Sequence, residues 1–318
     1  MSNIKKILAL AFCVALACLV LAGCKSQEPA VEEQQMPEAS EVKASGGETE
    51  PFYVLVVGND SRTGTTQIDL EQYADGLGRS DTCMLVRVDP KTYDICIITV
   101  PRDTAANVNG SKNKINDSYR QGGIKDLTAQ VTELTGVTPK YYLDMGFVNF
   151  EQFIDGVDSV DVNVPVEVAL KDIVNGGKKI TLEPGEQTLD GVKALVFCRA
   201  RHEYEMDQDA CRQIQDRQVV EKVIRKVLAD PSNTSKYTGA LEKFADTNWD
   251  SAGLEATVQN FVKNADKVVI RSGTGPYAGG DDAEAGMWLT TRDTETWKKV
   301  IEAAENNGDL NSVVPLPM

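Results

Sequence analysis

The sequence predicts a layered α/β domain, because segments with strand patterns and segments with helix patterns alternate along most of its length. The apolar run 52–57 has the length of a strand that is buried on both faces. The β-branched runs 82–88 and 94–100 flank the turn sequence Asp-Pro-Lys-Thr, which predicts a β-hairpin. Short strands are expected at 141–145 and 160–164.

Helices are predicted where apolar residues recur at helical spacing. In 124–134 the apolar positions form one stripe, and Gly136 follows as a stop signal. Asn149 is expected to cap the next helix, and Asp230-Pro231 to end the one whose buried face begins at Val219. Further helices are expected at 190–201, 236–245, 252–264 and 294–306, with a strand at 267–270 and a Gly-rich loop at 273–286.

The first 24 residues form a lipoprotein signal peptide. Lys5 and Lys6 precede a nearly continuous apolar segment, and the tetrapeptide ending in Cys24 resembles a lipobox. An uncleaved membrane anchor is the alternative interpretation. Lipidation of Cys24 would hold the protein on the outer face of a bacterial cytoplasmic membrane. Residues 25–50 are expected to form an acidic, disordered linker, 51–306 the folded domain and 307–318 a C-terminal tail.

The composition excludes some functions. A net charge of -15 over 318 residues disfavours nucleic acid as a partner, since phosphate backbones select basic faces. The sequence contains a single histidine, His202, and no Cys-x-x-Cys pair, which argues against a zinc site. The four cysteines that follow the signal peptide and linker could form disulfides or be buried thiols; they are Cys83, Cys96, Cys198 and Cys211.

Charged residues stand at both outer ends of the predicted hairpin. Arg79 and Asp81 precede its first strand, and Arg102 and Asp103 follow its second. Because a hairpin folds back on itself, these four side chains should meet at one edge of a sheet. A surface ion-pair cluster is the simplest interpretation of the hairpin alone. Asp60 also belongs to this edge, since it follows the first strand and ligands bind at the carboxyl ends of strands in open α/β sheets.

Five short motifs occur in a fixed order: Gly58-Asn59-Asp60-Ser61-Arg62, Gly78-Arg79-Ser80-Asp81-Thr82, Val100-Pro101-Arg102-Asp103-Thr104, Lys114-Ile115-Asn116 with Gly122-Gly123, and Arg199-Ala200-Arg201. Together they resemble the LytR-CpsA-Psr family over nearly all of residues 52–300. The resemblance implies an α/β/α sandwich around a mixed central sheet. It also implies a lipid tail held in an apolar tunnel and magnesium on a pyrophosphate.

The activity implied by this resemblance is an extracytoplasmic phosphotransferase. Such an enzyme takes a glycopolymer (teichoic acid, capsule or another wall polysaccharide) from a polyprenyl pyrophosphate carrier and joins it to peptidoglycan. Two alternatives stay open: a polyprenyl pyrophosphate hydrolase, and a polymer-binding lipoprotein without activity.

The residue chemistry suits this activity. Guanidinium groups bind phosphate oxygens in a bidentate way, which makes the following side chains candidates for pyrophosphate binding: Arg62, Arg79, Arg102, Arg199, Arg201 and Arg212. Mg²⁺ prefers a few carboxylates plus substrate oxygens, so Asp60 and Asp81 are the expected ligands. Arg102, Asp103 and Asp81 are the candidate catalytic residues, with Arg102 neutralising charge on the transferred phosphate.

One segment departs from the family pattern. Gln215 and Asp216 stand where the family has Arg-Gln, so one arginine is replaced. Arg217 could compensate, but it lies five residues past Arg212 and should point roughly 140° away on a helix. The departure raises the question of whether this corner of the site is competent.

Overall fold

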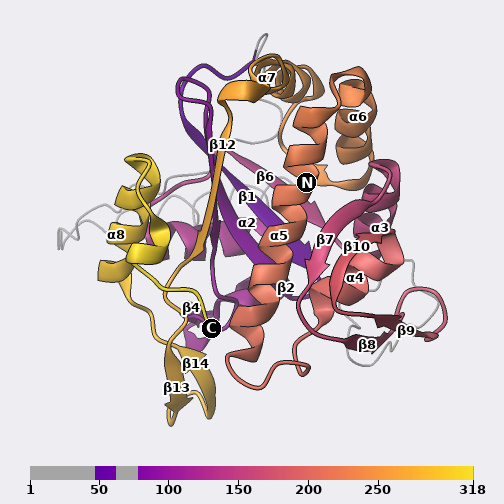
Figure 1. Cartoon of the computed structure of the whole chain (residues 1–318). Helices are drawn as coiled ribbons and strands as arrows, with labels where there is room; N and C mark the ends of the chain where they lie inside the picture. Colours follow the sequence, from indigo (N-terminus) through magenta and orange to yellow (C-terminus); the bar gives the residue numbers. More distant parts are fainter. Residues whose placement is uncertain (1–46, 62–77, 318) are drawn as a thin grey trace, which may run out of the picture. The chain divides into compact units, whose positions relative to one another are not determined.

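A computed structural model describes residues 47–61 and 78–317 of the chain. Their main feature is a mixed sheet of six described strands in the order β11-β6-β1-β2-β3-β12 (Figure 1). Strands β1 and β6 are parallel, as are β3 and β12, whereas the other neighbours are antiparallel. The strands are Phe52–Asn59 (β1), Ser80–Asp89 (β2), Asp94–Thr99 (β3), Tyr141–Met145 (β6), Asp246–Thr247 (β11) and Val269–Thr274 (β12).

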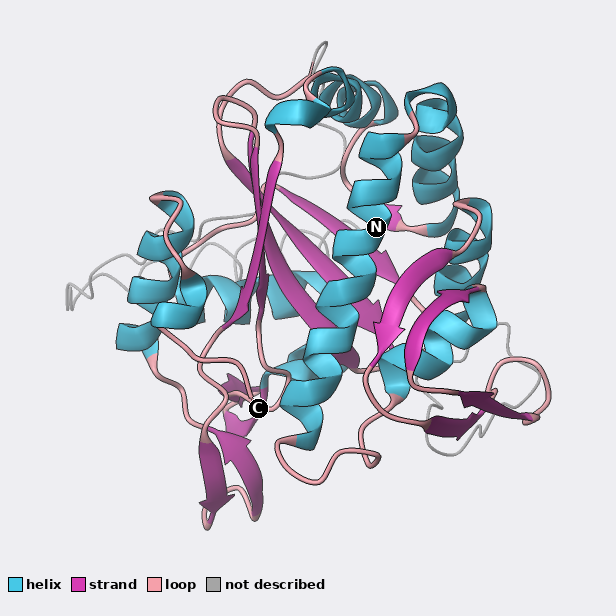
Figure 2. Cartoon of the chain, in the orientation of Figure 1, coloured by secondary structure: helices cyan, strands magenta, loops and turns pink. Residues whose placement is uncertain are grey.

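Helices cover both faces of this sheet (Figure 2). Side chains alternate along β1, so that Leu55 and Val57 enter one core while Val54 faces the other. The first core includes Leu127 of helix α2 (Ile115–Thr135) and Trp297 of helix α8 (Thr294–Glu305). The opposite face is covered by α3 (Phe147–Gly156), α5 (Gln208–Ala229), α6 (Thr234–Phe244) and α7 (Ser251–Lys263). The expected α/β/α sandwich around a mixed sheet is therefore confirmed.

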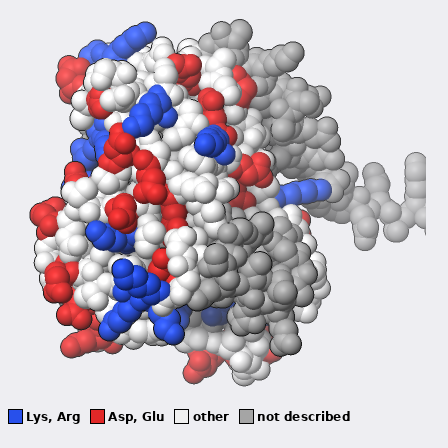
Figure 3. Space-filling view, turned by 90° about the vertical axis from the view of Figure 1, so that its right-hand side faces the viewer, with Lys and Arg blue, Asp and Glu red and all other residues white. Residues whose placement is uncertain are grey.

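A smaller region packs beside α3 and α5 and has its own core, which includes Val162, Leu182 and Phe197. It contains the strands Val160–Val164 (β7), Val168–Lys171 (β8), Lys179–Leu182 (β9) and Gly185–Leu189 (β10), and helix α4 (Gly191–Arg199). Asp190 caps α4 by accepting a hydrogen bond from the backbone N–H of Lys193. Acidic and basic side chains are interspersed on the face of the molecule seen in Figure 3.

Two further hairpins lie at the edge of the sheet where the catalytic candidates stand. They are β4 (Ala105–Val108) with β5 (Ser111–Lys114), and β13 (Gly279–Asp282) with β14 (Met287–Thr290). Thr290 connects the second hairpin to the motif at 100–104, because its N–H donates to the carbonyl of Asp103 and it forms a β-bridge with Thr104. Three 3-10 turns, at Pro231–Asn233, Ala265–Lys267 and Leu310–Ser312, complete the described elements.

Most of the predicted elements are present. The hairpin, both short strands and most of the helices are confirmed within a few residues at their ends, but α2 begins at Ile115, nine residues before the predicted start, and α5 begins at Gln208, well before Val219. The prediction that Asn149 caps a helix is wrong: α3 begins at Phe147, with Gly146 at its N-cap. The prediction of a loop over 273–286 is wrong in part, because β13 lies within this segment and pairs with β14. Gly279 and Gly280 take part in this pairing through their backbone groups.

The ordered packing extends past the expected boundaries at both ends. Glu48 accepts hydrogen bonds from Lys140 Nζ at 2.8 and 2.7 Å and from the Tyr141 hydroxyl at 2.5 Å, although the linker was expected to continue to residue 50. Leu310 and Val314, in the expected tail, are buried in the first core. The predicted lipidation site Cys24 and the predicted phosphate ligand Arg62 lie outside the described residues.

The four described cysteines are free thiols. Cys96 pairs in register with Arg87, four positions along β2 from Cys83, so the two thiols share a face but are not opposite each other. Burial raises the pKa of each of these two thiols to about 12. Within the described ranges, no helix is both long enough and apolar enough to span a membrane.

Candidate active site

The two charged ends of the β2–β3 hairpin meet, as the sequence predicts. Pairing continues past the strand end, where the Val100 N–H donates to the Cys83 carbonyl at 2.8 Å. Beyond this bond, Arg102 Nη1 lies 2.5 Å from Asp81 Oδ1. The Arg102 side chain is only 13% exposed. The pair is therefore not one of the weak surface ion pairs that the hairpin alone would suggest.

Helix α5 contributes Asp209 and Arg212, which extend the Asp81–Arg102 pair into a network of charged side chains. Asp209 Oδ1 lies 2.9 Å from Arg102 Nη2 and 3.1 Å from Arg212 Nε, so one carboxylate holds both guanidiniums. Arg212 Nη2 also donates to the backbone carbonyl of Asp81 at 2.8 Å. Asp209 is a site residue that the sequence patterns did not predict, and it lies three residues before the predicted Arg212 on the same helix.

The ionisation of this network follows from its contacts. Burial by itself would raise the pKa of Asp209, but Arg212 and Arg102 outweigh burial and lower that pKa to about 2. Burial would likewise lower the pKa of Arg102, and the Asp81 and Asp209 carboxylates reverse the effect and raise it. Asp209 and Arg102 are therefore charged at neutral pH.

Asp216 occupies the position where the family pattern has glutamine. Its Oδ2 atom accepts from Arg212 Nη1 at 2.6 Å and from the Thr82 hydroxyl at 2.7 Å. Gln215 instead donates to the carbonyl of Ala200 at 3.1 Å, which ties α5 to the Arg-x-Arg segment. The residue that replaces the family arginine thus has a structural contact of its own.

Arg217 does not compensate for the missing arginine. Its Nη1 donates to the Thr99 hydroxyl at 2.7 Å, and it is absent from the residues that line the cavity described below. Burial lowers the pKa of Arg217 to about 10. The expectation that it points away from Arg212 is confirmed.

Three of the predicted residues lie near the network but pair elsewhere. Arg79 Nε lies 2.6 Å from Asp117 on α2, and the Arg79 backbone N–H donates to Asp60 Oδ1 at 2.5 Å. Asp103 lies 2.8 Å from Lys114 Nζ, at the end of β5. The motif that contains Lys114 therefore fixes the residue that follows Arg102.

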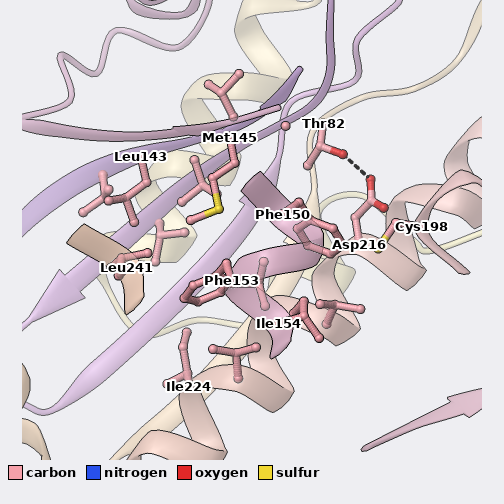
Figure 4. A pocket seen from close by; sticks show the side chains of 18 of the residues that line it. Thr82, Leu143, Met145, Phe150, Phe153, Ile154, Cys198, Asp216, Ile224 and Leu241 are labelled. Carbon is pink, nitrogen blue, oxygen red and sulfur yellow. Dashed lines mark hydrogen bonds between the residues drawn. The ribbon is translucent and has the colours of Figure 1, made fainter. Parts of the chain in front are cut away.

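An apolar cavity of about 640 Å³ opens beside this network, between the sheet and helices α3, α5, α6 and α7 (Figure 4). Its apolar wall includes Leu143, Phe150, Phe153, Ile154, Ile224 and Leu241. Its polar end is lined by Asp81, Thr82, Arg102, Arg199, Arg201, His202, Arg212 and Asp216. A single site therefore joins a cationic end to an apolar interior.

The Arg-x-Arg segment closes the polar end from the side of α4. Arg199 Nη1 donates to the carbonyl of Lys171 at 3.0 Å, and its guanidinium lies 5.8 Å from the ring centre of Phe147. Arg201 Nη2 lies 3.0 Å from His202 Nε2. Five predicted residues thus line the cavity: Asp81, Arg102, Arg199, Arg201 and Arg212. Asp60, Arg79 and Asp103 do not line it.

The donor set is compatible with a magnesium ion held largely by substrate. No group of three or more His, Cys, Asp or Glu side chains in the described ranges could enclose a metal. Mg²⁺ is commonly bound by one or two carboxylates together with phosphate oxygens, and Asp81 offers one carboxylate at the cavity. Asp60 lies beside Arg79, at the end of β1.

Comparison with known protein families shows which family this chain belongs to. The LytR_cpsA_psr family matches residues 20–306 of this chain. The chain belongs to the LytR-CpsA-Psr family. The resemblance carried by the five motifs is therefore confirmed.

Relatives of this LytR-CpsA-Psr protein have transferase names. The chain is 28% identical over 272 residues to the polyisoprenyl-teichoic acid--peptidoglycan teichoic acid transferase TagU of Bacillus mycoides (strain KBAB4), covering 81% of each chain. It is 30% identical over 199 residues to the corresponding transferase TagV of Bacillus subtilis (strain 168), covering 61% of this chain and 48% of TagV.

Solved structures of this family share the fold. B. subtilis TagV superposes with a TM-score of 0.66 at 22% identity, covering 85% of this chain and 100% of TagV. A structure of TagT bound to LI-WTA gives a TM-score of 0.60 at 19% identity, covering 88% of this chain and 96% of that one.

Proposed function

We propose that this protein transfers a glycopolymer from a polyprenyl pyrophosphate carrier to peptidoglycan. The observation that carries the proposal is the junction between the guanidinium cluster and the apolar cavity. A polyprenyl pyrophosphate has the same division, with a densely anionic head and a long hydrocarbon tail. The proposal also draws on the transferase names of TagU and TagV and on the TagT structure bound to LI-WTA.

In this proposal the arginines at the polar end bind the pyrophosphate. Arg199 and Arg201 approach from α4, while Arg102 approaches from the end of the hairpin. Arg102 Nε is buried and has no partner in the described part of the chain, so it is available to donate to a phosphate oxygen. Arg102 would neutralise charge that develops as the bond from phosphorus to the carrier breaks.

Asp103 has an indirect role in the same proposal. Its pairing with Lys114 fixes the backbone that follows Arg102, and Thr290 donates to its carbonyl at 2.9 Å. Asp103 would therefore orient the Arg102 segment. The acceptor hydroxyl also needs a base, for which an aspartate of the cluster is the best candidate.

We also propose that Asp81, with Asp60 nearby, holds Mg²⁺ at the site. A bound Mg²⁺ would neutralise charge on the pyrophosphate. Asp81→Asn should raise the Mg²⁺ concentration needed for half-maximal turnover and weaken the contact to Arg102. Titration of Mg²⁺ into chelator-treated wild type and variant measures this. Equal turnover in chelator and in Mg²⁺ would exclude a metal role.

The experiment that tests the transfer uses purified protein, a lipid-linked pyrophosphate glycopolymer and peptidoglycan. Transfer predicts polymer covalently attached to peptidoglycan, with carrier consumed in proportion. Carrier phosphate released at the same rate with and without acceptor would indicate a hydrolase. Carrier bound but unchanged would indicate a polymer-binding lipoprotein.

The anchoring of the protein is part of the same proposal. Lipidation of Cys24 would place the site on the outer face of the cytoplasmic membrane, where carrier and peptidoglycan meet. Incorporation of a labelled fatty acid into wild type and its loss in Cys24→Ala test this. Equal labelling of the two proteins would contradict it.

A further inference from the structure

Asp216 lies at the junction between the polar end of the cavity and its apolar interior. It lines the cavity, and its side chain is 3% exposed. Figure 4 shows the carboxylate between Thr82, which donates to Oδ2, and the thiol of Cys198. Its Oδ1 atom is buried, and no nitrogen or oxygen of the described residues donates to it. One carboxylate oxygen at this junction is thus without a conventional donor.

All three side-chain nitrogen atoms of the arginine beside Asp216 already donate to protein groups. Arg212 uses Nε for Asp209, Nη1 for Asp216 and Nη2 for the Asp81 carbonyl. A phosphate that approaches this corner therefore meets a guanidinium whose charge two carboxylates already offset. It also meets the Asp216 carboxylate itself, and like charges at short range in a buried site repel strongly.

A proton on Asp216 would remove both obstacles. A neutral carboxyl group interacts with a guanidinium far less strongly than a carboxylate does. The positive charge of Arg212 would then be offset by Asp209 alone, and it would attract the phosphate more strongly. The carboxyl O–H would also become a donor to a phosphate oxygen. The glutamine of the family pattern is neutral at this position, whereas this chain has an ionisable group.

We propose that binding of the polyprenyl pyrophosphate head group is coupled to uptake of one proton from solvent by Asp216. The proposal rests on the proposed function, because it requires a phosphate at this corner. Asp216 acts here as a positioning residue for Arg212. Because binding takes up a proton, the affinity for the carrier should increase as the pH falls.

Burial and the Asp209 carboxylate favour a proton on Asp216, whereas Arg212 and the hydrogen bonds from Thr82 and Cys198 favour its ionised form. Arg212, Arg217 and Asp209 lie on its own helix, Cys198 on α4 and the uncharged Thr82 on β2. Burial already raises the pKa of the Asp216 carboxyl in spite of Arg212, and a phosphate anion alongside would raise it further. A group whose pKa rises on binding takes up protons, so the association constant grows by at most about tenfold per pH unit lowered.

The test is calorimetric titration of polyprenyl pyrophosphate into detergent-solubilised full-length protein, in buffers of different ionisation enthalpy between pH 5 and 8. These titrations give the number of protons taken up per carrier bound. Asp216→Asn should reduce that number by up to one, bind carrier more tightly at high pH and show a flatter pH dependence. Asp216→Gln, which has the family residue, should behave in the same way and serves if the asparagine variant does not fold.

Glu151→Gln is the matched control. Glu151 is buried, with a pKa raised to about 7 by burial, but it does not line the cavity. Its variant should keep the proton uptake of wild type. Equal uptake in wild type and both Asp216 variants would overturn the inference while leaving carrier binding intact. No carrier binding by wild type at any pH would overturn the proposed function and this inference with it.

Discussion

At the scale of single residues, Asp209 determines the geometry of the site. It contacts Arg102 and Arg212 with the same oxygen atom, so a guanidinium from the segment after β3 and one from α5 are held side by side. Because both guanidiniums are buried, loss of this carboxylate would leave two charges without full compensation. Its contribution to stability should therefore be measurable by changing the pH.

Asp209→Asn should lower the free energy of unfolding at pH 7 by roughly 2 kcal/mol, since a carboxyl whose pKa falls from 3.8 to about 2 contributes about that much. A lowered pKa in the folded state stabilises the fold above pH 4 and loses this effect as the pH falls toward 2. The difference between variant and wild type should shrink over that range in chemical denaturation. Asp281→Asn, on exposed β13, is the control and should stay within about 0.5 kcal/mol. A difference that does not depend on pH would contradict the ionic role.

At the scale of an element, the interruption of α2 decides which residues reach the site. Gly122 and Gly123 have non-helical dihedrals inside the helix, and Gly123 has φ +65° and ψ -148°. The first half of α2 can therefore run in a different direction from the second half, and it carries Asp117 to Arg79. The second half carries the predicted apolar stripe into the core through Leu127 and Val131.

Gly123→Ala should destabilise the protein by roughly 1–3 kcal/mol, since residues with a side chain rarely adopt this conformation. Gly239→Ala on α6 is a matched control, because an added Cβ there meets nothing within 4 Å and the backbone has no positive φ. That variant should be unchanged or more stable by about 0.5–1 kcal/mol. Thermal unfolding of both variants provides the comparison. Equal effects would show that the kink at Gly123 imposes no constraint.

At the scale of the whole molecule, the cavity exists because the helices on one face leave space above the sheet. Valines of β1 and β2 form its floor, and α5, α6 and α7 form its walls. The opposite face of the same strands is packed against α2 and α8. The two faces of the sheet therefore have different roles, one in stability and one in the proposed binding of the lipid tail.

Ile224→Trp should obstruct the cavity and raise KM for a carrier with a long polyprenyl chain. Displacing two methylene groups from the wall would already cost roughly tenfold in affinity. A carrier with a short prenyl chain should be affected much less. Arg225→Trp places the same side chain at the neighbouring exposed position of α5 and should leave both values unchanged. An equal loss for long and short chains would contradict a lipid-binding role.

The sequence by itself determined the elements and the family. Strand and helix periods located the hairpin, the two short strands and the main helices, because apolar spacing reflects local burial. The five motifs identified the family, and the hairpin geometry brought Asp81 to Arg102. These features depend on local pattern, or on strands that are adjacent in the chain.

Only the tertiary structure decided the contacts between distant segments. Asp209 reaches Arg102, and Thr82 reaches Asp216, across more than a hundred residues, because α5 packs against the start of β2 and the segment that follows β3. The hairpin formed by β13 and β14 is stabilised by pairing that a Gly-rich sequence does not indicate. The cavity, likewise, depends on the gap that α3, α5, α6 and α7 leave over the sheet, and no periodic pattern in one segment encodes that distance.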